Sequence, residues 1–162
     1  MSETLVVNAS PLIFLDYIDG IHWLTRLASK PIIVPVVVIQ EIEAGDSGAA
    51  LVSRLHADAD ITISPKLELS PFIAAWDLGA GESQVLAYSQ VNTGSRAVLD
   101  DKAARDCARS LNIPIIGTLG IVLAVKQRGW IPAAKPVINQ LLAHELYLST
   151  DLIKAALAEV GE

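Results

Sequence analysis

The chain has 162 residues, of which 52% are hydrophobic, 19% charged and 5% aromatic, and its net charge is −6 at neutral pH. These values exclude a disordered segment, and they fit a single globular domain with a core of aliphatic side chains. A lone cysteine, Cys107, excludes an internal disulfide framework and a zinc site built from several cysteines.

Neither the longest apolar stretch nor the N-terminal sequence predicts a membrane or secreted protein. The longest nearly apolar stretch, residues 113–125, is interrupted by proline and glycine and is shorter than the roughly 20 apolar residues that a bilayer span needs. The first residues, Met1, Ser2 and Glu3, place an acid where a secretory signal carries positive charge. We therefore expect a cytoplasmic protein.

The charges are unevenly distributed along the chain. Residues 102–135 contain six basic residues and one acid, whereas the rest of the chain is strongly acidic. Such asymmetry can provide one face for a polyanion and another for a cation. Ordinary solvated helix faces explain it equally well, and the charge alone favours that simpler explanation.

The first half of the chain alternates short apolar runs with helical patterns. We expect strands at 5–7, 31–34 and 61–63, and helices at 11–18, 23–27 and 48–59. Pro11 suits a first helical turn that Ser10 can cap. Residues 35–45 fit a helix by spacing and a strand by their valine and isoleucine content, and residues 64–80 give no clear pattern.

The second half continues the alternation. We expect helices at 82–91, 102–111 and 118–128, strands at 96–99 and 113–116, and closing helices at 136–144 and 150–160 with a short strand near 146–148. Alternating strands and helices predict an α/β fold with a mostly parallel sheet, in three α/β/α layers. We expect one domain over residues 1–162, with about 136–162 as a helical C-terminal extension.

Two polar signals follow predicted strands, which is where parallel sheets place their binding sites. Asn8 follows the first strand, and Asp100 and Asp101 follow the strand at 96–99. Helix capping explains either aspartate alone. The pair gains significance only where other carboxylates approach it.

Two further acids are candidates for that approach. Helical spacing places Glu41 on the face of Val37 and Val38, and both an inward and an exposed position remain open for it. Glu82 follows a Gly-Ala-Gly turn, where a simple first-turn acid is the default interpretation. Carboxylates that meet in a dry site need a cation, and oxygen ligands of this kind suit Mg²⁺ or Mn²⁺.

Basic side chains accompany the aspartate pair. Lys102, Arg105 and Arg109 lie at i, i+3 and i+7 of the helix that the pair opens, and such a stripe can meet phosphates. The three histidines lack metal-ligand spacing, and Ser10 lacks the setting of a hydrolase nucleophile.

These segments, taken in order, resemble the PIN-domain family, and in particular a prokaryotic subgroup of mostly uncharacterised members. The resemblance rests on Val6-Val7-Asn8-Ala9-Ser10-Pro11, on Ile32-Ile33-Val34-Pro35 leading to Glu41, on Gly79-Ala80-Gly81-Glu82-Ser83, on Val98-Leu99-Asp100-Asp101 and on Ile115-Ile116-Gly117-Thr118. It covers nearly all of the chain.

The resemblance implies a metal-dependent ribonuclease that uses Mg²⁺ or Mn²⁺. Members of the family often serve as the toxin of a toxin–antitoxin pair and often form homodimers, so the resemblance implies both properties for this chain as well. By position, the metal ligands would be Asn8, Glu41, Glu82 and Asp100, with Asp101 as an alternate or helper in catalysis. Thr118 would orient a water or a phosphate, and Lys102, Arg105 and Arg109 would contact RNA.

Asn8 departs from the family pattern, which has aspartate there. The predicted function is therefore an endoribonuclease, with a catalytically silent nucleic-acid-binding or regulatory module of the same fold as the alternative. A receiver-like signalling domain also places paired acids, a threonine and a lysine at strand ends, but its acids follow the first strand, whereas the pair here follows a late one.

Overall fold

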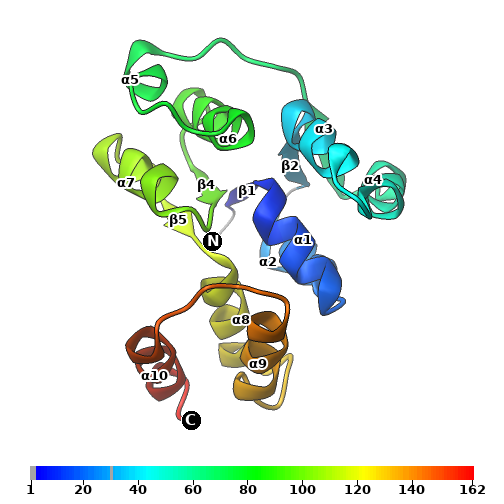
Figure 1. Cartoon of the computed structure of the whole chain (residues 1–162), viewed down its shortest axis with the longest axis vertical. Helices are drawn as coiled ribbons and strands as arrows, with labels where there is room; N and C mark the ends of the chain where they lie inside the picture. The colour runs from blue at the N-terminus through cyan, green and yellow to red at the C-terminus, as the bar shows by residue number, and fades with distance from the viewer. Residues whose placement is uncertain (1–2, 30) are drawn as a thin grey trace.

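Five short strands form the centre of the computed structural model, which describes residues 3–29 and 31–162. The strands are β1 (Thr4–Val7), β2 (Ile32–Pro35), β3 (Ile61–Ser64), β4 (Ser95–Val98) and β5 (Ile115–Ile116). The helices around them are α1 (Ala9–Tyr17), α2 (Ile21–Leu27), α3 (Val36–Ala44), α4 (Gly48–Ala57), α5 (Pro71–Ala74), α6 (Ala80–Val91), α7 (Lys102–Ser110), α8 (Thr118–Gln127), α9 (Lys135–Ala143) and α10 (Thr150–Glu159) (Figure 1).

All strand pairs are parallel, and the strand order is β3-β2-β1-β4-β5. The chain builds outward from β1 to β2 and β3, and it then crosses to the other side of β1 to add β4 and β5. The direction of building therefore reverses between β1 and β4. In open parallel sheets a reversal of this kind opens a crevice at the carboxyl ends of the two strands.

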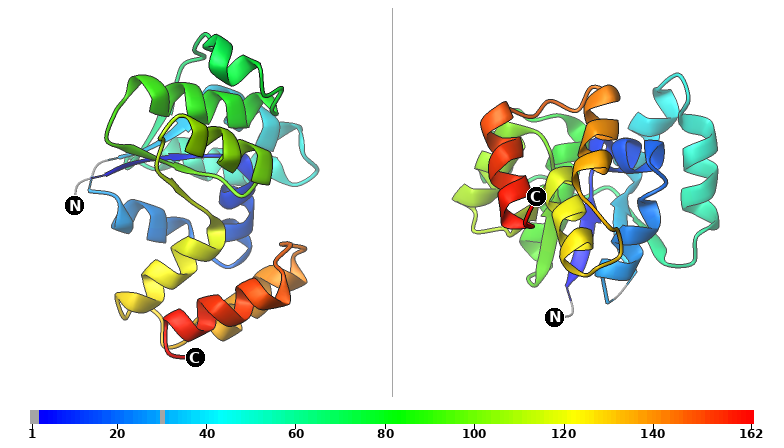
Figure 2. Two further views of the ribbon diagram at one scale, coloured as in Figure 1. Left: turned by 90° about the vertical axis from the view of Figure 1, so that its left-hand side faces the viewer. Right: turned by 90° about the horizontal axis from the view of Figure 1, so that it is seen from below.

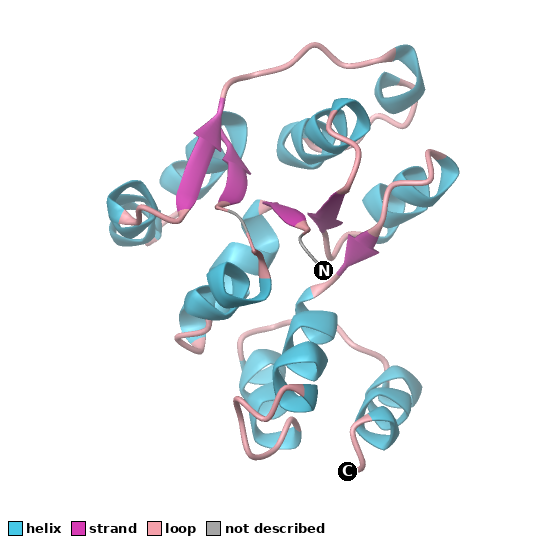
Figure 3. Ribbon diagram, turned by 180° about the vertical axis from the view of Figure 1, so that it is seen from behind, coloured by secondary structure: helices cyan, strands magenta, loops and turns pink. Residues whose placement is uncertain are grey.

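Helices cover both faces of the sheet, which gives the expected three layers. Helix α6 packs on β1, β2 and β4, and α7 packs on β5. On the other face α1, α2 and α8 pack against one another, and α9 packs beneath α8 (Figures 1 and 2). The strands are enclosed by helices in the view from behind as well (Figure 3).

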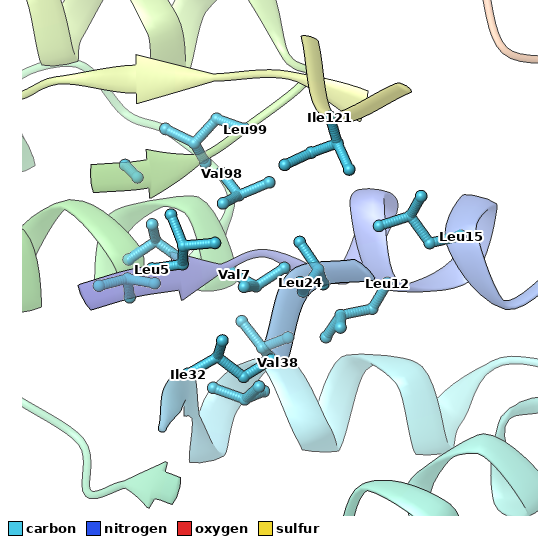
Figure 4. Packing of buried hydrophobic residues seen from close by; sticks show 14 of the residues in the cluster. Leu5, Val7, Leu12, Leu15, Leu24, Ile32, Val38, Val98, Leu99 and Ile121 are labelled. Atoms are coloured by element: carbon cyan, nitrogen blue, oxygen red, sulfur yellow. The ribbon is translucent and has the colours of Figure 1, made fainter. Parts of the chain in front are cut away.

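The core is aliphatic, as the composition predicts. The three apolar residues of β1 are buried, and they pack with Leu12 and Leu15 of α1 and with side chains from β2, β4 and α8 (Figure 4). A strand that is buried on both faces carries a continuous apolar run instead of an alternating one. Burial of each such side chain contributes about 1.5–3 kcal/mol of transfer free energy.

The structure decides the ambiguous segment after β2. Residues Val36–Ala44 form helix α3, with Val38, Ile39 and Ile42 buried. Pro35 ends β2 and is the N-cap residue of α3, so the chain turns from strand to helix without a loop. The packing of one apolar helical face therefore outweighs the strand propensity of the valines and isoleucines.

Two expectations about local structure were wrong, and one segment without a predicted pattern contains a helix. Residues 146–148 form no strand, and the unassigned segment 64–80 contains the short helix α5. Strand β5 begins at Ile115 instead of Ile113. Pro114 explains the late start, because it has no N–H to donate and contributes only its carbonyl oxygen, which accepts from the Ala97 N–H at 2.8 Å.

Within the described residues, every helix is too short or too polar to cross a bilayer.

The last residue of the chain caps a helix through its side chain. The Glu162 carboxylate accepts hydrogen bonds from the N–H groups of Ala134 (2.6 Å) and Lys135 (3.1 Å) at the start of α9. The hydrogen bond from the Ala134 N–H is the main cause of a lowered pKa for Glu162. This contact fastens the end of α10 to α9.

We expect Glu162→Gln to lower the melting temperature at pH 7, because an amide is a weaker acceptor than a carboxylate at a helix N-terminus. Since the pKa of Glu162 is lowered on folding, its contribution is complete above the glutamate pKa of the unfolded chain and is lost as the pH falls through the lowered value. Melting curves of both proteins from pH 7 to pH 3 should therefore converge in acid. The exposed Glu43→Gln is the control, and a Glu162→Gln deficit that is the same at every pH would contradict the cap.

Candidate functional site

Polar side chains gather at the crevice between β1 and β4. Asn8 follows β1 directly, and Asp100 lies two residues beyond the end of β4. Glu41 reaches the same edge from α3, and the first turn of α6 lies beside it. The strand-end position predicted for the site is thus the position that the fold gives these residues.

Asn8 is the buried centre of this group. Its side chain is 2% exposed, and its backbone N–H donates to the Val98 carbonyl of the neighbouring strand at 3.2 Å. Asn8 is the N-cap residue of α1, yet its side chain makes no capping hydrogen bond. Its amide oxygen Oδ1 is buried and has no partner among the described residues. An unsatisfied buried acceptor costs roughly 1–3 kcal/mol, so this oxygen is positioned for something other than stability.

Glu41 meets the first turn of α6. Its Oε1 accepts a hydrogen bond from the Gly81 N–H at 2.9 Å. The residue as a whole is exposed, so the structure selects the exposed of the two positions that the sequence left open, with only the carboxylate turned to the site.

Gly81 is what allows the approach. A Cβ at this residue would stand 2.9 Å from Oδ1 of Asn8 and closer still to Oε2 of Glu41. The two oxygens are therefore close to each other beside the Gly81 backbone. Since both are acceptors, a cation or a donor that contacts both of them would be stabilised by both.

Asp100 forms the second part of the site. Its Oδ1 accepts from the Thr118 N–H at 2.7 Å, and its Oδ2 accepts from the Thr118 hydroxyl at 2.6 Å. The Ser10 hydroxyl approaches Oδ2 at 3.4 Å. Thr118 is fully buried at the first position of α8, so the carboxylate is fixed by one helix start and touched by another.

The first turn of α1 joins the two parts, because it holds Asn8 at its cap and Ser10 within one turn. The structure does not, however, unite Glu41, Glu82 and Asp100 in one cluster. Among residues 3–29 and 31–162, no three histidine, cysteine or acidic side chains lie close enough to hold a metal ion. The Glu82 carboxylate folds back onto Gly79 at the start of its own helix. The expected meeting of three carboxylates is therefore replaced by two adjacent oxygen groups.

The residues after Asp100 have separate tasks. Asp101 is the N-cap residue of α7, and its carboxylate accepts from the Ala104 N–H at 3.0 Å. Lys102 and Arg109 both pair with Asp106, at 2.7 and 3.0 Å, and the hydrogen bond from Lys102 is the main cause of a lowered pKa for Asp106. The predicted basic stripe is consequently split.

Arg105 turns the other way, toward the site. Its Nη1 donates to the Leu99 carbonyl at 3.1 Å, and it lies beside the Gly117 backbone near Asp100. Of the three basic residues of α7, Arg105 is the one that this structure places next to a site carboxylate.

Burial raises the pKa of the Cys107 thiol on the same helix, which leaves it a poor nucleophile.

Sequence reasoning missed Gln84. Its buried amide accepts from the Leu67 N–H and donates to the Leu67 carbonyl, both at 2.8 Å. These two hydrogen bonds, which resemble those between neighbouring strands, attach the loop that precedes α5 to helix α6. A cleft of about 920 Å³ lies between this loop, α3 and α6. The sequence did contain one signal for this contact, namely a glutamine in an apolar helical segment two residues after Glu82.

The order and geometry of these residues agree with a comparison of the sequence with protein families. A family model described as a PIN domain matches residues 4–162. The chain belongs to the PIN-domain family. No curated protein matches it at a significant level. The family relation establishes a nuclease-type fold, whereas the reaction and partners of this member are matters for proposal.

The residues at the crevice of this PIN domain fit a hard divalent cation. The available donors are an amide oxygen, carboxylates and hydroxyls, which suit Mg²⁺ or Mn²⁺ better than softer metals. Asn8 supports this fit. Its buried Oδ1 has no partner among the described residues and lies near the Glu41 carboxylate, so a cation that contacts both oxygens would satisfy both groups.

We expect Gly81→Ala to destabilise the PIN domain, although alanine is normally preferred to glycine within a helix by about 1 kcal/mol. The added Cβ would displace the Glu41 carboxylate and break its hydrogen bond to residue 81. Thermal unfolding of the single variant and of Gly81→Ala combined with Glu41→Ala measures the effect. The double variant should recover part of the loss, since the displaced side chain is gone, and a Gly81→Ala protein more stable than the wild type would contradict this geometry.

Proposed function

We propose that this PIN domain is a metal-dependent endoribonuclease that cleaves RNA phosphodiester bonds with Mg²⁺ or Mn²⁺. The observation that carries the proposal is the buried Oδ1 of Asn8, which has no partner among residues 3–29 and 31–162 and lies near the Glu41 carboxylate at the carboxyl end of β1. Asp100, fixed by Thr118, adds a second carboxylate at the neighbouring strand end. Oxygen donors converging at this crevice support a cation site on a nuclease-type fold.

Asn8, Glu41 and Asp100 would hold the metal, with Glu82 as the further ligand that the family pattern implies. When bound, the metal supplies an activated water and neutralises charge that develops on the phosphate. The protein groups have supporting tasks. Thr118 keeps Asp100 oriented through two hydrogen bonds, and the Gly81 N–H keeps Glu41 oriented through one. The Arg105 guanidinium, beside Asp100, would contact a phosphate oxygen.

Asn8 is also the reason for a second candidate function. A neutral amide in place of aspartate removes one negative charge from the ligand set, and each lost charge weakens the binding of a hard cation. With a net charge of −6 for the chain, the same fold can serve as a catalytically silent module that binds RNA or regulates another protein. Asp101, which caps α7, would then be purely structural together with the other acids.

The proposal extends to the cellular role. We propose a cytoplasmic toxin restrained by a small antitoxin protein, because the uneven charge leaves acidic surface for a basic partner. A short reading frame that overlaps the start of the gene, and whose product co-purifies with this chain, would support that role.

We expect Asp100→Asn to lower Mn²⁺ affinity and to slow RNA cleavage on the order of a hundredfold, the usual effect of removing one group that stabilises transition-state charge. Asn8→Asp should tighten Mn²⁺ binding and raise or preserve cleavage, since it restores a ligand charge. Titration calorimetry with Mn²⁺ and a fluorescent RNA measure both quantities in the same proteins.

Asp60→Asn is the matched control, because Asp60 is exposed and precedes β3 at the opposite edge of the sheet. It should change neither quantity. If wild type and Asn8→Asp are equally inert with Mg²⁺ and Mn²⁺, and Asp100→Asn binds Mn²⁺ as the wild type does, the nuclease proposal fails and the silent module takes its place.

We also expect a homodimer, because 52% hydrophobic residues in a chain of this size leave apolar helical surface to cover. A specific symmetric contact would bury roughly 1,200 Å² or more in total. Light scattering at micromolar concentration should give twice the mass of the 17.2 kDa chain. A mass of one chain at that concentration would contradict the expectation.

A further inference from the structure

The end of α8 holds a tryptophan in a fixed place. The helix stops in a glycine turn, in which the Gly129 N–H donates to the Lys126 carbonyl at 2.9 Å and the Trp130 N–H donates to the Val125 carbonyl at 3.1 Å. Gly129 has a φ of 72°, the left-handed conformation that this type of helix end requires. The Trp130 side chain is half-buried and packs against the hydrophobic core. Both its backbone and its ring are therefore anchored.

Two arginines lie against this ring. The guanidinium carbon of Arg26, in the last turn of α2, is 3.8 Å from the ring centre. That of Arg128, the C-cap residue of α8, is 5.9 Å from the same centre. Both distances are within the range of a cation–π contact. One indole thus holds two positive charges near each other, although like charges repel.

Neither of these arginines forms an ion pair with an acidic side chain in the part of the chain that the structure describes. The other four arginines each lie close to a carboxylate, namely Arg54, Arg96, Arg105 and Arg109. Acids outnumber bases in this chain, which has a net charge of −6. Two neighbouring arginines without a carboxylate are therefore a local excess of positive charge that an external anion would neutralise.

The N–H groups of the pair are largely available for such an anion. Both side chains are exposed. Nη1 of Arg128 donates to the Ala124 carbonyl at 3.4 Å, and Arg26 makes no side-chain hydrogen bond within residues 3–29 and 31–162. A helix C-terminus favours a nearby cation, but that effect gives the remaining donors no partner. A guanidinium that is stacked on an aromatic face keeps its N–H groups in one plane, the geometry that matches a phosphate.

We propose that Arg26 and Arg128, held on Trp130, form a phosphate-binding site that contacts the RNA backbone away from the crevice. The inference rests on the proposed function, because it takes RNA as the ligand, and it adds a second point of contact to it. Lys126, in the same turn of α8, is not part of the site, since its Nζ donates to the Pro132 carbonyl at 3.0 Å.

The site lies at the edge of the sheet opposite to the crevice. Helix α2 ends shortly before β2 begins, so Arg26 is near the amino-terminal ends of the strands (Figure 2). Helix α8 begins with Thr118 beside Asp100, and its ten residues extend about 15 Å toward the two arginines. The phosphate bound there is therefore not the one that is cleaved. Contacts of this kind position a strand and carry no sequence information.

The test measures the binding of a fluorescein-labelled single-stranded RNA of about 16 nucleotides by anisotropy. The full chain is used in EDTA, so that no metal supports cleavage. Arg26→Gln and Arg128→Gln should each weaken binding several-fold, and the double variant about tenfold. Fewer counterions are released when a phosphate contact is lost. The slope of log affinity against log salt, between about 50 and about 200 mM, should therefore become shallower by about 0.7 for each variant.

Arg54→Gln is the matched control, because it removes the same charge from an exposed arginine that already pairs with Asp16. It should change neither the affinity nor the salt slope. Trp130→Leu keeps both charges but removes the ring that holds them, and it should weaken binding, whereas Trp130→Phe should behave as the wild type. Melting temperatures show that each variant is folded. Arginine variants that lower the melting temperature yet bind RNA as Arg54→Gln does would show a purely structural role and overturn the site.

The outcomes separate this inference from the function on which it rests. If the wild type cleaves RNA with Mn²⁺ but the double arginine variant binds it as Arg54→Gln does, the phosphate site is refuted and the nuclease stands. If no metal supports cleavage while binding still depends on the two arginines, the site stands and the silent module is the function. If the double variant leaves RNA binding unchanged and instead alters the mass measured by light scattering, the pair belongs to a contact between copies of the chain, and the RNA site is overturned.

Discussion

The parallel pairing of β1 with β4 is the contact on which the whole site depends. Four residue pairs hold the two strands in register, and the N–H of Asn8 adds one more hydrogen bond to Val98 beyond the last pair. The strands are far apart in sequence, and the chain adds β2 and β3 before it returns to β1. Their shared register places Asn8 and Asp100 at one crevice, and α1, α3, α6 and α8 bring every other polar group of the site to that edge.

The site combines one well-satisfied carboxylate with one unsatisfied amide. Asp100 accepts hydrogen bonds on both oxygens, so its orientation is fixed. Asn8 has no partner for Oδ1 in the part of the chain that the structure describes, and this oxygen lies near the Glu41 carboxylate. An aspartate in this position would place two negative charges close together in a poorly solvated crevice, at a cost that only a cation would offset. The amide avoids this repulsion, and it weakens the attraction for a cation.

The sequence was sufficient for most of the elements and for the edge of the sheet at which the site forms. Continuous apolar runs such as Leu5-Val6-Val7 identify strands buried on both faces, and the residue that follows such a strand must lie at its carboxyl end. The sequence did not predict the direction in which the side chains point. Whether Glu41 faced inward depended on where α6 begins, and the contact that decides it is made by the backbone of Gly81, which no side-chain pattern encodes. The same holds for Glu82, which turns back on Gly79. The basic stripe failed for a different reason, because Asp106 lies at i+4 from Lys102 and at i−3 from Arg109 and binds both, a pairing that helical spacing in the sequence already allowed.

Helix α6 makes two contacts that serve different parts of the molecule. Its first turn donates to Glu41 through Gly81, and its second turn clamps the loop before α5 through the two hydrogen bonds of Gln84 to Leu67. One helix therefore positions both the Glu41 carboxylate and the loop before α5. Ala80, Ser83 and Gln84 of the same two turns also line the wide cleft beside α3, so the cleft and the candidate site share one structural wall.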